Sequence, residues 1–223
     1  MKTFFHALAA TLALGLLTSV AFADSLSLTG PQIAGEGLGN GNGQQAAAIS
    51  FTAATNQTNL SMTAPLNGFG ASETVTWWIT NSLGPSTTGA NVIDTGTFAG
   101  PAGSCCSPPA ITFTIFSGEN LAAGTYYVVL STIGTPNNNT GWIFTNSPSL
   151  SSTGSLSYGN SFITALGPNG FAPDFSYFSS PNVQLEFDMT SDQVVSTPEP
   201  GSLFLLGSGL IGAGSFVRRK LIS

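Results

Sequence analysis

Short runs of alternating apolar and polar residues recur through the middle of this chain, without a comparable helical period. The runs are rich in β-branched and aromatic residues, and clusters of Gly, Pro, Asn and Ser separate them. Alternation with a period of two places one face of a strand on a core and the other face in solvent. We therefore predict strands at residues 48–53, 74–80, 91–98, 111–116, 125–132, 141–145 and 183–190.

The run at 185–190 alternates Leu, Phe and Met with Glu, Asp and Thr, which predicts an apolar inner face and a polar outer face. By contrast, the run at 126–130 is continuously apolar, which suits a central strand. About eight to ten strands in one domain favour two antiparallel sheets packed face to face. We predict an all-β sandwich, jelly-roll or immunoglobulin-like, over residues 24–192.

The N-terminus has the three parts of a secretory signal peptide. Lys2 supplies a positive start, an apolar stretch follows, and Ala21 and Ala23 form an A-x-A cleavage site. We predict a signal helix within residues 1–23 and cleavage before Asp24.

A second apolar run lies near the C-terminus, at residues 201–217, and it contains no charge. As a helix it is about 25 Å long, which is at the short limit for spanning a membrane. The cluster Arg218, Arg219 and Lys220 follows directly and favours the cytoplasmic side, leaving the preceding chain on the outer face. We predict a short transmembrane helix at 201–217 and a basic cytoplasmic tail at 218–223.

The triplet Pro198, Glu199 and Pro200 precedes this helix, in a linker that we place at 193–200. The prolines disfavour helix and present the glutamate on an extended segment. The triplet, the short Gly-rich helix and the basic cluster together resemble the PEP-CTERM sorting signal of Gram-negative bacteria. That resemblance implies export and an inner-membrane anchored precursor. An exosortase then recognises the triplet and removes the helix, and the product goes to the cell surface or an extracellular matrix.

All basic residues of the chain lie in these two terminal segments. Between residues 24 and 197 there is no Lys, Arg or His, while nine of the ten acidic residues lie there. Nucleic-acid binding needs cations that neutralise phosphate, so nucleic acid is excluded as a partner. A catalytic triad needs a histidine, and zinc sites use His or several Cys, so those classes are excluded too. We expect a protein that is not an enzyme.

The two cysteines, Cys105 and Cys106, are adjacent in sequence. Neighbouring Cα atoms lie about 3.8 Å apart, whereas disulfides usually join Cα atoms about 4.4 to 6.8 Å apart. We predict a strained vicinal disulfide, with intermolecular pairing as the alternative.

We call residues 24–197 the body of the protein. Three acids near its end are candidate site residues: Glu186, Asp188 and Asp192. Residues two apart on a strand share a face, so the first two predict at least a solvated acidic surface. Clustered carboxylates suit calcium, which makes these acids candidate calcium ligands, and we expect no other cofactor. A carboxylate pair at this spacing also suits glycoside hydrolysis.

Trp77 and Trp78 are successive residues of a predicted strand, so one faces the core and the other faces outward. An outward-facing indole can stack on a sugar ring, which makes this pair a candidate glycan site.

Together these features predict an exported, acidic β-sandwich at the cell surface or in a biofilm matrix, associated with exopolysaccharide. An acidic body repels acidic polymers, so we expect a neutral glycan or a polymer bridged by calcium. The alternatives are a carbohydrate-active hydrolase that uses paired carboxylates and a purely structural matrix subunit.

Overall fold

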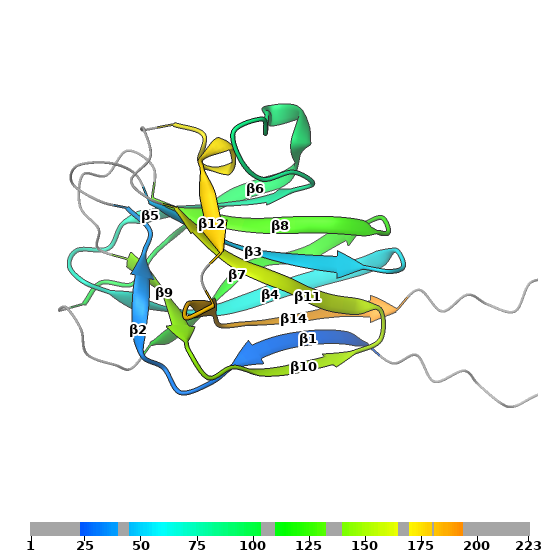
Figure 1. Cartoon of the computed structure of the whole chain (residues 1–223), viewed down its shortest axis with the longest axis horizontal. Helices are drawn as coiled ribbons and strands as arrows, with labels where there is room; N and C mark the ends of the chain where they lie inside the picture. Colours follow the sequence, from blue (N-terminus) through cyan, green and yellow to red (C-terminus); the bar gives the residue numbers. More distant parts are fainter. Residues whose placement is uncertain are drawn as a thin grey trace, which may run out of the picture. The chain divides into compact units, whose positions relative to one another are not determined.

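The structure is a computed structural model that describes residues 23–39, 45–103, 110–132, 140–164, 170–179 and 181–193. Within these ranges the chain forms fourteen strands and two short 3₁₀ helices, η1 (Gly89–Asn91) and η2 (Ala172–Asp174), and no α-helix. The strands make two antiparallel sheets (Figure 1). The predicted all-β architecture of two antiparallel sheets is therefore confirmed.

The first sheet contains eight strands. They are β1 (Asp24–Thr29), β2 (Ala34–Gly37), β4 (Gln57–Gly68), β7 (Ile111–Leu121), β9 (Thr140–Thr145), β10 (Ser149–Thr153), β13 (Gln184–Leu185) and β14 (Phe187–Gln193). Six of them follow one another in the order β10-β1-β14-β4-β9-β13, while β2 pairs with β9 and β7 pairs with β4.

The second sheet contains six strands. They are β3 (Ala46–Ala53), β5 (Thr74–Thr80), β6 (Val92–Ala99), β8 (Gly124–Ser131), β11 (Leu156–Thr164) and β12 (Tyr177–Ser179). Their order is β12-β11-β3-β8-β5-β6, so β8 lies between β3 and β5. The central position predicted for residues 126–130 is confirmed.

The main core lies between the two sheets and contains their inward-facing apolar residues. Leu26, Met62 and Phe187 from the first sheet and Ile49 and Val128 from the second are each at most 1% exposed. Burying one such side chain stabilises the fold by about 1.5 to 3 kcal/mol. A slip of one residue in a strand would turn these side chains outward, so the apolar alternation fixes the register.

A smaller apolar cluster covers the outer face of the second sheet. Trp78 and Val129 belong to it, and the segment 171–177, which contains η2, packs over them. Two hydrogen bonds hold this segment: the Tyr177 hydroxyl donates to the Ala172 carbonyl at 2.8 Å, and the Gly84 amide donates to the Pro173 carbonyl at 3.0 Å. The second sheet is therefore buried on both faces around β8.

Each run that we predicted as a strand overlaps an observed strand, and the run at 74–80 coincides with β5. Strands β1, β2, β4, β10, β11 and β12 were not predicted. The choice between a jelly-roll and an immunoglobulin-like sandwich stays a prediction. So do the domain boundaries, because both terminal segments and most of the linker lie outside the described residues. The described residues contain no helix long and apolar enough to cross a membrane, and the predicted helix at 201–217 is not among them.

Candidate functional site

Glu186 and Asp188 do not form the solvated acidic surface that we predicted, because Glu186 is buried and Asp188 is exposed. Strand β13 ends before Glu186 and β14 begins after it. At this break the Glu186 amide donates to the Ile143 carbonyl at 3.0 Å, and the Trp142 indole donates to the Glu186 carbonyl at 2.7 Å. Glu186 is 4% exposed, whereas Asp188 is exposed on the outer side of the sheet. The chain changes neighbours at this point, because β13 pairs with β9 whereas β14 pairs with β1 and β4.

The Glu186 side chain is buried, and only one of its two carboxyl oxygens has a side-chain partner. The Gln32 amide donates to Oε2 at 3.5 Å, while Oε1 is buried without a hydrogen-bond partner. Burial raises the pKa of Glu186, and hydrogen bonds from Gln32 and the Gly30 backbone oppose that rise. The use of this carboxylate pair in glycoside hydrolysis stays a prediction.

The predicted calcium ligands also do not come together. The Asn59 amide donates to the Asp192 carboxylate at 3.1 Å, and a register shift between Thr190 and Asp192 separates this end of β14 from Asp188. Among the residues that the structure describes, no three acidic, His or Cys side chains are grouped so as to hold a metal ion. Calcium binding by Glu186, Asp188 and Asp192 therefore gains no support from the described residues and stays a prediction.

The two tryptophans face opposite sides of β5, as expected, but neither is available to stack on a sugar. Trp77 lies in the main core against Phe116, with 5.6 Å between ring centroids, and is 8% exposed. Trp78 faces outward, yet it is only 5% exposed because the segment 171–177 covers it. Phe171 of that segment meets it edge to face at 6.3 Å. The prediction of an open indole was wrong because it did not foresee this cover.

The feature that sequence reasoning missed is a polar surface on the outer side of the first sheet. Two rows of small side chains follow the register across neighbouring strands, and we call them together the hydroxyl face. The first row crosses β10, β1, β14, β4 and β7 and consists of Ser151, Ser27, Asp188, Thr63 and Thr114. The second row crosses β10, β1, β14 and β4 and consists of Thr153, Ser25, Thr190 and Ser61.

The geometry of the hydroxyl face follows from strand spacing. Neighbouring strands lie about 4.8 Å apart, so the first row is about 19 Å long, and the rows are about 7 Å apart. Every member is exposed or partly exposed. Asp188 is the only charged member, and each hydroxyl can both donate and accept a hydrogen bond. Ser25 and Thr153 already show such a bond across strands, at 2.9 Å.

A second unpredicted feature is a pair of carboxyl groups that joins the two sheets. Asp94 lies on β6 and Glu119 on β7, and their side chains are hydrogen-bonded to each other. Burial raises the pKa of Glu119, and the hydrogen bond to Asp94 and its negative charge raise it further. Residues 25 positions apart on different sheets give no local sequence signal of such a contact.

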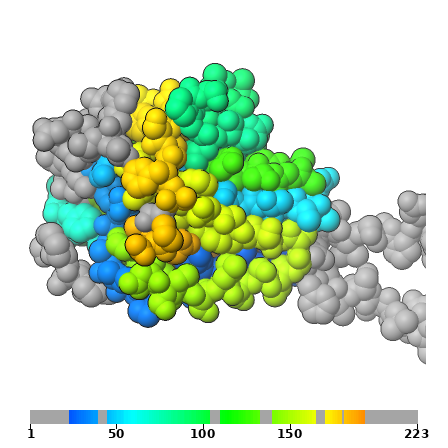
Figure 2. All heavy atoms as spheres, in the orientation of Figure 1, coloured from blue at the N-terminus to red at the C-terminus, as the bar shows by residue number. Residues whose placement is uncertain are grey.

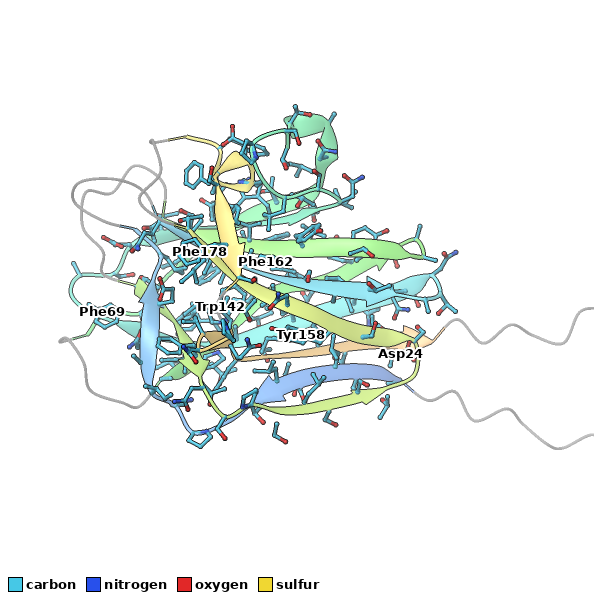
Figure 3. All side chains as sticks on the ribbon, viewed as in Figure 1. Asp24, Phe69, Trp142, Tyr158, Phe162 and Phe178 are labelled. Atoms are coloured by element: carbon cyan, nitrogen blue, oxygen red, sulfur yellow. The ribbon has the colours of Figure 1, made fainter. Side chains whose placement is uncertain are left out.

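The remaining predicted residues divide into two that the structure describes, Asp24 and the exposed Ala23, and a larger group that it does not. Asp24, at the predicted cleavage site, is 1% exposed, and its carboxylate accepts hydrogen bonds from the Ser155 amide and hydroxyl. Figure 3 labels it at one end of the sandwich, with Trp142 toward the other. Outside the described residues lie Ala21, Cys105, Cys106, Pro198, Glu199, Pro200, Arg218, Arg219 and Lys220.

Comparison with known proteins finds one similarity. The family model described as PEP-CTERM protein-sorting motif matches residues 196–220. No curated protein and no solved structure matches the chain closely enough to count as similar. The predicted sorting motif is therefore confirmed at the C-terminus, and it indicates an exported protein that an exosortase sorts and processes.

Proposed function

We propose that this exosortase-sorted chain is a non-enzymatic protein of the cell surface or biofilm matrix, and that it associates with neutral exopolysaccharide through the hydroxyl face. The observation that carries the proposal is the pair of Ser and Thr rows across five strands. A polysaccharide presents hydroxyl groups at regular intervals, and rows of hydroxyls offer matching donors and acceptors.

The negative charge of the body favours neutral polymers over acidic ones. With nine acids and no Lys, Arg or His between residues 24 and 197, the body repels acidic polymers. The hydroxyl face itself carries one charge, on Asp188, so a neutral chain can lie along it with little electrostatic cost.

Because the tryptophans are buried, they cannot add stacking energy to the binding of a sugar. Without stacking on an indole, each sugar gains only hydrogen bonds that replace bonds to water, worth about 0.5 to 1.5 kcal/mol each. Binding to a short oligosaccharide is therefore weak. A long polymer gains by repeated contacts, because each later contact is made at a high effective concentration.

The test is co-sedimentation of the exported protein with a panel of insoluble neutral and acidic polysaccharides, with calcium and with a chelator. The double variant Thr63→Val and Thr114→Val removes two hydroxyls from the first row and keeps the side-chain shape. We expect severalfold weaker binding to the neutral polymers. The control is Thr97→Val, which removes an exposed hydroxyl from β6 of the other sheet.

Two results would contradict the proposal: binding to none of the polymers, or an equal loss in the Thr97→Val control. Binding that requires calcium would assign recognition to the acids instead of the hydroxyl face. A purely structural matrix subunit is the second candidate function, and a free sheet edge at β10 favours it.

A further inference from the structure

Among the strands that the structure describes, six lie at sheet edges, and five of these are unsuited to pairing with another chain. Exposed edges invite intermolecular pairing, and proteins discourage it with charges, bulges or short strands. This body has no Lys to place there. Instead β2 carries Glu36, β6 carries Asp94 and β7 carries Glu119, while β12 and β13 are three and two residues long. Strand β7 also shows three register shifts against β4.

The sixth edge, β10, has none of these protections. Its five residues, Ser149–Thr153, include no charge, Pro or Gly, and all five are exposed. They pair with β1 in one continuous register without a shift. Leu150 is 52% exposed, although it lies opposite the buried Leu28 on the inner side of the sheet.

The position of β10 leaves its outer edge accessible. Figure 1 shows it as the outermost strand beside β1, and in Figure 2 the yellow-green atoms of the β10 and β11 region form the lower rim. The chain is also uncharged from residue 120 to residue 173. Strand β10 itself therefore carries no acidic group, and Asp24 on the neighbouring β1 is 1% exposed and accepts a hydrogen bond from the Ser155 amide.

We propose that β10 pairs antiparallel with β10 of a second copy of this chain, which joins two first sheets into one continuous sheet. The distribution of acidic residues favours a second copy of this chain as the partner of β10. Each copy is acidic and would be repelled from the edges with Glu36, Asp94 or Glu119, whereas β10 offers a neutral meeting point.

The sequence of β10 suits this symmetric pairing. With Ser151 at the centre, Ser149 of one copy lies opposite Thr153 of the other, and Leu150 lies opposite Ser152. Ser and Thr pairs across strands are favourable, and the fold already contains one between Ser25 and Thr153. The pairing buries part of both Leu150 side chains. It also continues the first row of the hydroxyl face from one copy into the next, because Ser151 of one copy lies opposite Ser151 of the other.

This inference goes beyond the proposed function, because the association needs neither glycan nor calcium. We would measure sedimentation velocity of the exported protein over a wide concentration range in a glycan-free buffer with a chelator. Wild-type protein should form a reversible dimer. Ser151→Glu places two carboxylates opposite each other and should weaken the dimer by roughly tenfold or more. Thr190→Glu adds the same charge to a central strand of the same sheet and should leave the dimer unchanged.

Hydrogen exchange of the wild-type protein gives a second readout that needs no variant. The outward-pointing amides of residues 149–153 should gain protection as the concentration rises, because they become hydrogen-bonded in the dimer. A monomer at all concentrations would overturn the proposal. So would a dimer without added protection at 149–153, or an equal effect of Ser151→Glu and Thr190→Glu. Each outcome is independent of whether polysaccharide binds.

Discussion

At the scale of single residues, Glu186 is the clearest conflict between charge and burial. It is 4% exposed, and its Oε1 has no hydrogen-bond partner. Burial raises its pKa above the ordinary value of 4.5. An acid with a raised folded-state pKa costs no stability at low pH, where it is neutral in both states. The cost develops as pH rises through and above 4.5, because ionisation then favours the unfolded chain.

The variant Glu186→Gln should therefore stabilise the protein at neutral pH. We expect a gain of about 1 kcal/mol at pH 7, of the order found for a poorly satisfied buried polar group, and almost no gain at pH 4. Urea unfolding at both pH values measures it. The control Asp188→Asn alters an exposed carboxylate and should show little difference. A gain as large at pH 4 as at pH 7 would show that the charge of Glu186 is not the cause.

At the scale of elements, the sequence predicted strands where β-branched and aromatic residues alternate, and it failed where they are scarce. The run at 74–80 is rich in Thr, Val, Trp and Ile and coincides with β5. Strands β1 and β10 consist mainly of Ser, Leu and Thr, and their extended form depends on pairing with neighbours. The alternation at 183–190 predicted one strand, but the structure has two, because β13 pairs with β9 and β14 pairs with β1 and β4.

The segment 171–177 is an element whose role could not be predicted, because its contact with Trp78 joins residues far apart in sequence. Phe171→Ala should remove the ring that meets Trp78 edge to face, at a cost of about 1 kcal/mol in stability. All three tryptophans are at most 8% exposed, so acrylamide quenches their fluorescence weakly in the wild type. Quenching should increase in the variant.

Phe178→Ala is the matched control, since Phe178 is 49% exposed on β12, next to the same segment. It should leave quenching and stability nearly unchanged. Unchanged quenching in Phe171→Ala would mean that other residues of the segment shield Trp78 without this ring.

At the scale of the whole molecule, the hydroxyl face shows why a site can escape sequence reasoning. Within one strand the signal is readable: Ser25 and Ser27 alternate with leucines, and Thr112 and Thr114 flank a phenylalanine. The rows exist only because β10, β1, β14, β4 and β7 become neighbours, although they are far apart along the chain. The order of strands depends on long-range pairing, which local alternation does not specify.

The distribution of charge along the whole chain gives a direct test of processing. Trypsin cleaves after Lys and Arg, and these occur only at Lys2, Arg218, Arg219 and Lys220. Removal of both terminal segments would leave a chain without any trypsin site. The exported protein, fully denatured, should therefore keep its intact mass during trypsin treatment.

A protease specific for Glu is the control, because it can cut after Glu36, Glu73, Glu119 and Glu186 in the same sample. Loss of a short C-terminal fragment to trypsin would show that the basic tail is retained. The exported product would then still carry cations, which would weaken its repulsion of acidic polymers.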